Sequence, residues 1–230
     1  MAIFYGIGIG PGDSELVTVK GSRLLQELDI LYTPEAKKHA KSLALAISEP
    51  YLSKDLQIKQ RHFPMVVDRE SKEEKWKDIA NEIISDVQHG YNVGFITLGD
   101  PMVYSTYSYL IELIGSQIDT QTIPGITSYN SMAASLGIPL VMDEESFAVL
   151  PATAEQDKLE AALQIHETLV IMKVANHLDV ILPLLAKYDL LDKTYLVSKA
   201  STQEQTICHG LTGLSSNEKL SYFTTMLVKK

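Results

Sequence analysis

Residues 93–98 read Val-Gly-Phe-Ile-Thr-Leu, and Gly99, Asp100 and Pro101 follow them directly. An almost continuous apolar run of this length is typical of a central strand in a parallel sheet, buried on both faces. The glycine, aspartate and proline then end the strand abruptly. Sheets of this kind bind their ligands outside the carboxyl ends of the strands. This stretch therefore predicts an α/β fold and the edge of the sheet where a site should lie.

The residues on both sides of this strand alternate short apolar runs with helical stretches, which is typical of an α/β domain. Thr18 is expected to cap a helix whose apolar face is Val19, Leu24, Leu25 and Leu28. The clearest helix spans residues 72–88, where six apolar side chains follow a 3.6-residue period and Gly90 provides the stop: Trp76, Ile79, Ala80, Ile83, Ile84 and Val87. Further strands are predicted at 3–9, 29–33 and 118–123, and further helices at 105–113 and 128–136.

The second half of the chain repeats this alternation and predicts a second, smaller α/β domain. Strands are expected at 147–150, 169–173, 195–198 and 222–228, with helices at 155–165 and 176–187. The polar residues 141–146 form the candidate linker, so the expected domains are 1–141 and 142–230. A ligand cleft is the natural expectation where two such domains meet.

Composition excludes several classes of protein. The chain has 230 residues and a net charge of −9, whereas a non-specific nucleic-acid binder is usually basic. A single cysteine, Cys208, cannot form an internal disulfide, and no apolar run approaches a membrane span. The six histidines show no metal-ligand spacing, so no protein-bound metal is expected. The expected location is the cytoplasm, with no nucleic-acid or membrane partner.

One basic stretch opposes the acidic balance of the chain. Residues 37–61 carry six basic side chains against Glu49 and Asp55: Lys37, Lys38, Lys41, Lys54, Lys59 and Arg61. The stretch is either a solvated surface arm or a docking site for a polyanionic ligand. In the second interpretation Lys37, Lys38, Lys41 and Arg61 are the candidate ligand-binding residues.

Glycines at the end of the first strand suggest a ligand loop. Residues 6–13 read Gly-Ile-Gly-Ile-Gly-Pro-Gly-Asp, but neither glycine pair has the third glycine of a dinucleotide fingerprint, because Pro11 and Asp13 occupy those positions. A structural turn and a loop for a ligand other than a dinucleotide both remain open. A third Gly/Pro segment, Pro124-Gly125, follows the strand at 118–123. We expect the three segments to converge, although Asp100 by itself is equally well explained as a helix cap.

Taken together, these segments resemble the tetrapyrrole (corrin/porphyrin) methylases, the class III methyltransferases that use S-adenosylmethionine (SAM). The resemblance covers the chain and rests on three stretches: GIGPGDSELVTVKG at 8–21, GFITLGDPMVY at 94–104, and TIPGITSYNSMAASLGIPL at 122–140. Within the family the chain is most similar to the members that methylate carbon 20 of precorrin-2 or cobalt-factor II in cobalamin (corrin) biosynthesis. Five shorter runs carry this narrower likeness: 63–65 with Asp68, 104–107, 149–152, 172–173 and 222–225.

The resemblance implies a homodimer of two-domain protomers, with SAM in the cleft between the domains and a tetrapyrrole as methyl acceptor. It places twelve residues at the SAM site: Pro11, Leu98, Gly99, Asp100, Val103, Ser105, Thr106, Thr127, Ser128, Met172, Ala200 and Thr225. Residues 199–204 match the family only loosely. Methyl transfer from a sulfonium depends mainly on positioning, and Asp100 and Tyr104 are candidates to accept the proton that leaves the ring.

Several alternatives stay open at this stage. One is another tetrapyrrole-ring methylase of the same family, and another is a non-catalytic ligand-binding relative. A nucleotide-dependent oxidoreductase is disfavoured by the incomplete glycine fingerprint.

Overall fold

The computed structural model describes residues 1–34, 42–63 and 69–230. The chain divides into two compact units, Met1–Thr127 and Ser128–Lys230. This division falls earlier than the boundary expected after Val141, because helix α5 (Ser128–Leu136) packs on the sheet of the second unit. Each unit is a five-stranded sheet with helices, in agreement with the predicted pair of α/β domains. None of the helices within the described ranges combines the length and apolarity that crossing a membrane requires.

The sheet of the first unit is entirely parallel, as the run at 93–98 predicts. Its strands are β1 (Phe4–Gly8), β2 (Ile30–Pro34), β3 (Gln57–Arg61), β4 (Val93–Thr97) and β5 (Thr120–Ile123). They lie in the order β3-β2-β4-β1-β5, so β4 is central and every one of its residues is buried. The helices are α1 (Val19–Glu27), α2 (Leu43–Ser48), α3 (Arg69–Gln88) and α4 (Thr106–Ile114), with short 3₁₀ turns at Ser14–Leu16 and Glu49–Tyr51.

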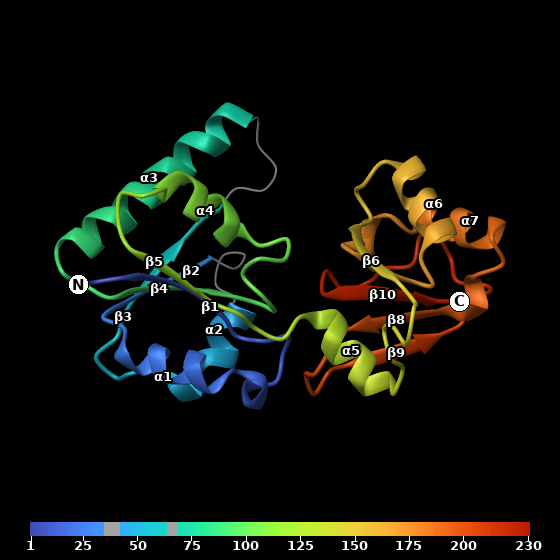
Figure 1. Cartoon of the computed structure of the whole chain (residues 1–230), viewed down its shortest axis with the longest axis horizontal. Coiled ribbons are helices and arrows are strands. Elements are labelled where there is room, and N and C mark those ends of the chain that lie inside the picture. The colour runs from blue at the N-terminus through green and yellow to red at the C-terminus, as the bar shows by residue number, and fades with distance from the viewer. Residues whose placement is uncertain (35–41, 64–68) are drawn as a thin grey trace. The chain divides into compact units, whose positions relative to one another are not determined.

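Helices α3 and α4 cover one face of this sheet, and α1 and α2 cover the other (Figure 1). The predicted stripe of α3 is buried against the sheet, from Trp76 to Val87. Gly6 of β1 faces the buried ring of Tyr107 from α4 so closely that a Cβ on Gly6 would lie 2.2 Å from the ring.

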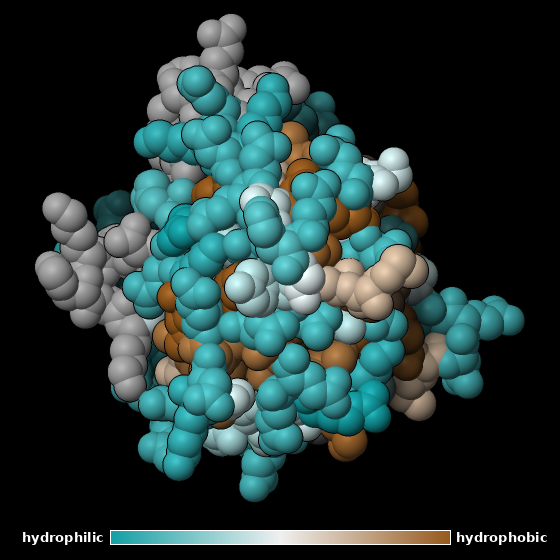
Figure 2. Space-filling view, turned by 90° about the vertical axis from the view of Figure 1, so that its left-hand side faces the viewer, coloured by the Kyte–Doolittle hydropathy of each residue, from teal (hydrophilic) through white to brown (hydrophobic). Residues whose placement is uncertain are grey.

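The amino ends of the strands lie toward the left of Figure 1, and the surface on that side is mostly hydrophilic (Figure 2).

Helix α1 begins as predicted, but one residue of its expected apolar face is misplaced. The Thr18 Oγ1 accepts a hydrogen bond from the Gly21 N–H at 3.0 Å, which confirms the cap. Leu24, Leu25 and Leu28 are buried, whereas Val19 is 87% exposed. Nine residues at 100° each place Val19 about 180° around the helix from Leu28, so the two cannot face the same core.

Helix α2 and the edge strand β3 were not among the elements predicted from the sequence. Strand β3 is polar, and its Lys59 and Arg61 are both held by carboxylates of α3. The Lys59 ammonium lies 2.7 Å from Asp86 and 3.2 Å from Glu82, while the Arg61 guanidinium donates to Glu82 through Nε at 2.8 Å and through a second nitrogen. The two cations of β3 are therefore neutralised within the first unit.

These ion pairs shift the titration of the groups that form them. The hydrogen bond from Arg61 holds the pKa of Glu82 below its usual value of 4.5, and Lys59 adds to the effect against the opposing influence of burial. Burial would lower the pKa of Lys59, but its bonds to Asp86 and Glu82 more than offset this and raise it. The Tyr32 hydroxyl donates to Asp86 at 2.6 Å, and burial together with that bond raises the pKa of Tyr32.

We predict that Glu82→Gln lowers the free energy of unfolding at pH 7 by roughly 1 kcal/mol, because it removes the charge that Arg61 and Lys59 face. A carboxylate whose pKa is lowered by folding stabilises the fold above pH 4.5, and the stabilisation is lost as the pH falls through the lowered pKa. Urea titrations between pH 7 and pH 3 should show a smaller acid-dependent loss in Glu82→Gln than in the wild type. The control is Glu74→Gln, an exposed carboxylate on the same helix. Equal acid dependence in all three proteins would contradict the prediction.

The sheet of the second unit is mixed rather than parallel. Its strands are β6 (Phe147–Pro151), β7 (Thr168–Met172), β8 (Thr194–Ser198), β9 (Thr206–His209) and β10 (Thr224–Lys229), in the order β6-β7-β10-β8-β9. Only β6 and β7 are parallel, because β10 enters between β7 and β8 antiparallel to both. The helices α6 (Gln156–Ile165) and α7 (Leu178–Lys187) cover one face and α5 covers the other (Figure 1), with 3₁₀ turns at Val174–Asn176 and Leu191–Lys193.

Candidate functional site

The three glycine-bearing segments meet at the carboxyl edge of the first sheet. The segment after β1 is joined to the segment after β4 by an antiparallel bridge, in which the Gly99 N–H donates to the Gly10 carbonyl at 2.8 Å. The Asp100 carboxylate accepts a hydrogen bond from the Gly125 N–H at 3.0 Å, which brings in the segment after β5. The convergence expected from the sequence is present in the structure.

Glycine is required here because the three backbones touch. A Cβ on Gly125 would lie 2.1 Å from the Gly99 carbonyl oxygen, and a Cβ on Gly8 would lie 2.6 Å from the Gly125 nitrogen. Distances below 3.0 Å to backbone atoms leave no room for a side chain. Gly99 itself has φ +67°, a left-handed conformation that glycine adopts without strain. The segments therefore pack backbone against backbone and leave their peptide groups at the edge of the sheet.

Asp100 ties these segments together instead of capping a helix. One carboxylate oxygen accepts from the Met102 N–H at 2.8 Å, and the other accepts from Gly125. The cap of α4 is Ser105, whose Oγ accepts from the Tyr107 N–H at 3.1 Å. The interpretation of Asp100 as a helix cap is therefore wrong, since the helix starts five residues later than that interpretation needs.

The loop between β4 and α4 holds most of the predicted SAM contacts of the first unit. Leu98 is half-buried, and the Val103 N–H donates to the Asp100 carbonyl at 3.3 Å. Tyr104 has φ +49°, a conformation that costs a non-glycine residue about 1–2 kcal/mol. Thr106 is the first residue of α4. Of the two other predicted contacts in this unit, Pro11 and Thr127 are both buried.

Thr97 is a candidate site residue that was not among those predicted from the sequence. It is the last residue of β4, it is only 8% exposed, and its Oγ1 has no hydrogen-bond partner among the described residues. A buried hydroxyl without a partner costs free energy, so it calls for an explanation. The one sequence signal was a threonine inside an otherwise apolar strand, directly before the Gly-Asp-Pro turn.

The second unit brings its predicted SAM contacts to the face of the sheet that α5 covers. The Ser128 and Thr225 hydroxyls are 3.3 Å apart, although the residues are distant in the sequence. Ala200 is buried in the apolar cluster of this face, and Met172 packs against that cluster. These four residues therefore lie in one region of the second unit.

The predicted polyanion site is only partly described. Lys37, Lys38 and Lys41 lie outside the described residues, as do Pro64, Met65 and Asp68. Arg61 is described, and its charge is matched by Glu82, as shown above. Its remaining nitrogen donates to the Gln60 carbonyl at 2.8 Å. To bind a substrate carboxylate, Arg61 would have to give up its hydrogen bonds to Glu82 or to the Gln60 carbonyl.

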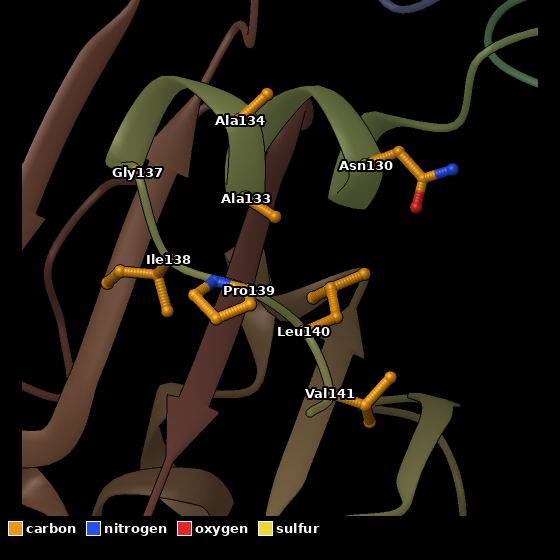
Figure 3. A pocket seen from close by; sticks show the side chains of 8 residues that line it. All are labelled: Asn130, Ala133, Ala134, Gly137, Ile138, Pro139, Leu140 and Val141. Atoms are coloured by element: carbon orange, nitrogen blue, oxygen red, sulfur yellow. The ribbon is translucent and has the colours of Figure 1, made fainter. Parts of the chain in front are cut away.

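A hollow of about 510 Å³ lies in the second unit, between α5 and the segment that follows it. Figure 3 shows Asn130 and Ala133 on the helix and Pro139, Leu140 and Val141 on that segment. The lining contains no titratable side chain, so this hollow supplies no acid–base chemistry. Within the described ranges, no three His, Cys, Asp or Glu side chains are grouped to hold a metal ion.

Comparison with known proteins places this geometry in a family. The model of the tetrapyrrole (corrin/porphyrin) methylases matches residues 4–214, which include all three glycine-bearing segments. The chain belongs to the tetrapyrrole methylase family. Family membership sets aside the oxidoreductase alternative. Asp13, which stands where a dinucleotide fingerprint has its third glycine, instead caps a 3₁₀ turn: its side chain accepts from the Glu15 N–H at 2.9 Å.

Two relatives of this methylase share almost its whole length. It is 38% identical to the cobalt-precorrin-2 C(20)-methyltransferase of Salmonella typhimurium, over 98% of this chain and 95% of that protein. It is 28% identical to the precorrin-2 C(20)-methyltransferase of a Sinorhizobium species, over 97% of this chain and 93% of that protein.

Solved structures of other methyltransferases share the fold. A cobalt precorrin-4 methyltransferase superposes with a TM-score of 0.78 at 18% identity, covering 99% of this chain and 94% of that one. The uroporphyrin-III C-methyltransferase of Thermus thermophilus, solved with S-adenosylhomocysteine, superposes with a TM-score of 0.70 at 20% identity, covering 100% of this chain and 98% of that one. The two-sheet architecture is thus that of the class III methyltransferases.

We predict that Thr97→Val leaves the free energy of unfolding unchanged or raises it by up to about 1 kcal/mol, because valine removes an unpartnered buried hydroxyl. The control is Thr168→Val, which deletes a buried hydroxyl that donates to the Leu140 carbonyl at 2.6 Å and should cost about 1–3 kcal/mol. Urea unfolding followed by circular dichroism measures both. A comparable loss in the two variants would mean that the Thr97 hydroxyl already has a partner within the protein.

Proposed function

We propose that this chain transfers a methyl group from SAM to carbon 20 of precorrin-2 or cobalt-factor II, a step in cobalamin biosynthesis. The observation that carries the proposal is the 38% identity to the Salmonella typhimurium enzyme over nearly the full length of both chains. Membership of the tetrapyrrole methylase family supports the wider statement that the chain is a SAM-dependent methyltransferase acting on a tetrapyrrole.

We place SAM at the carboxyl edge of the first sheet, where the three glycine-bearing segments meet. Gly8, Gly99 and Gly125 let the three segments meet there, and the Thr97 hydroxyl at the end of β4 is a hydrogen-bonding group without a partner among the described residues. SAM supplies an electrophilic methyl group on a sulfonium. All twelve SAM contacts expected from the sequence stay predictions. Four of them belong to the second unit: Ser128, Met172, Ala200 and Thr225.

The residues of this edge act chiefly by positioning. Methyl transfer to an electron-rich ring carbon is an in-line displacement in which the leaving thioether needs no proton. Holding the reacting atoms roughly 3–3.5 Å apart and aligned can lower the barrier by up to about 7–11 kcal/mol. The two hydrogen bonds of Asp100 support this role, because they hold the loops after β4 and β5 in one arrangement before any ligand binds.

The ring carbon must also lose a proton once its new bond has formed. Asp100 is our candidate for the acceptor, since each carboxylate oxygen that accepts one backbone N–H retains a further lone pair. Tyr104 lies on the same loop and is 46% exposed. The carboxylates of the substrate are proposed to meet the basic stretch that begins at Lys37.

We predict that the product carries its new methyl on carbon 20. Purified enzyme, carbon-13 methyl-labelled SAM and either precorrin-2 or cobalt-factor II should give one new labelled resonance, assigned by NMR to the meso carbon between the first and last pyrrole-derived rings. Comparing the two substrates shows whether cobalt must already be present in the ring.

Each other outcome of that experiment has a defined meaning. A label on a different carbon would indicate another tetrapyrrole-ring methylase of the same family. Binding of S-adenosylhomocysteine without transfer to either ring would indicate a non-catalytic relative. Omission of SAM provides the blank.

A second prediction concerns Asp100. Asp100→Asn keeps one oxygen acceptor but turns an amide N–H₂ toward one of the two backbone donors, so one loop is released. We expect the affinity for S-adenosylhomocysteine, measured by calorimetry, to fall roughly tenfold, which corresponds to about 1.4 kcal/mol. The control is Asp119→Asn, an exposed carboxylate beside the amino end of β5. Wild-type affinity in Asp100→Asn would remove this carboxylate from the organisation of the SAM site.

Assembly as a homodimer stays a prediction. Sedimentation equilibrium of the purified chain measures it directly, and a monomer at micromolar concentration would contradict it.

A further inference from the structure

Two large apolar side chains project into solvent from the loop between β4 and α4. Met102 is 57% exposed and Tyr104 is 46% exposed, and the adjacent residues Val103 and Ser105 are half-buried. A single exposed apolar residue is ordinary on a protein surface. Met102 and Tyr104 expose a thioether and an aromatic ring on the loop at the edge of the sheet where ligands bind.

The backbone conformation of Tyr104 is strained. Its φ of +49° lies in the left-handed region, where glycine or asparagine is the usual residue and a bulky aromatic is an outlier. Strained residues of this kind cluster at ligand sites, where the surrounding structure determines them. Glycine at position 104 would relieve this strain, but the chain has a tyrosine there. A function of the aromatic ring would account for a tyrosine at a strained position.

Hydrogen bonds on both sides of Tyr104 fix the loop. Before it, Met102 and Val103 donate their N–H groups to the side chain and the carbonyl of Asp100. After it, Ser105 caps α4, and the Ser108 hydroxyl donates to the Pro101 carbonyl at 3.3 Å. The exposed positions of Met102 and Tyr104 are thus set in advance by the loop.

We propose that Met102 and Tyr104 form the surface against which one face of the tetrapyrrole ring lies, and that Tyr104 contributes its aromatic ring and not its hydroxyl. This inference rests on the proposed function. A tetrapyrrole has broad apolar faces and carboxylates at its rim. Aromatic rings pack against such faces by offset stacking, and a thioether packs favourably against the edge or face of a conjugated ring. The same loop carries Asp100, so contact with this surface places the macrocycle beside the loops proposed to hold SAM.

The experiment compares Tyr104→Gly, Tyr104→Phe and Met102→Ala with the wild type. For each protein it measures KM and kcat for the tetrapyrrole, the affinity for S-adenosylhomocysteine, and the midpoint of urea unfolding. The matched control is Tyr91→Gly, because Tyr91 is 47% exposed and precedes β4 at its amino end, away from the loop.

We expect Tyr104→Gly to raise the tetrapyrrole KM roughly tenfold while its S-adenosylhomocysteine affinity stays within about twofold of the wild type. Its unfolding midpoint should not fall, because glycine relieves the left-handed conformation. Met102→Ala should raise KM about threefold. Tyr104→Phe retains the ring, so its tetrapyrrole KM should stay clearly below that of Tyr104→Gly. Tyr91→Gly should leave the KM unchanged.

Two results would overturn the inference while leaving the proposed function in place. An unchanged KM in Tyr104→Gly, with active wild-type enzyme, would show that the ring does not contact the substrate. A loss of kcat in Tyr104→Phe at unchanged KM would show that the hydroxyl accepts the proton. A wild-type protein that binds no S-adenosylhomocysteine and gives no product with either ring would instead refute the proposed function, and this inference with it.

Discussion

The close approach of three backbones at the carboxyl edge of the first sheet is the constraint on which the candidate site depends. Gly8, Gly99 and Gly125 come from three segments that the sequence separates widely, and neither Gly8 nor Gly125 has space for a Cβ. A parallel sheet places the ends of β1, β4 and β5 together, because β1 pairs with both of the others. Glycine at each end then allows the loops to pack against one another.

Asp100 converts this packing into a defined geometry. Glycine contacts alone would leave the loops free to slide, whereas a carboxylate that accepts N–H groups from two segments fixes their relative position. The strained backbone at Tyr104 lies in the same loop, between the Asp100 turn and the Ser105 cap. Such preorganisation suits a reaction that needs alignment more than acid–base chemistry.

The local charge of the sequence does not show which charged groups of the first unit stabilise the fold and which are available to a ligand. Lys59 and Arg61 belong to the most basic stretch of the chain, yet they hold the edge strand β3 against α3 through Asp86 and Glu82. A polar edge strand needs such contacts, since one of its sides is unpaired and its side chains add little to the core. A positive local charge in the sequence therefore did not mean that every cation was available to a ligand.

The sequence by itself determined the elements whose signal is local. Hydrophobic periodicity located α3, the apolar run located β4, and the glycine motifs indicated both the edge of the sheet and the family. Tertiary structure decided what depends on distant partners: the polar edge strand β3, the mixed order of the second sheet, and the role of Asp100, whose Gly125 partner is 3.0 Å away in space and far along the chain. Periodicity records which face of an element is apolar, but a hydrogen bond between separate loops exists only once the sheet has brought their ends together.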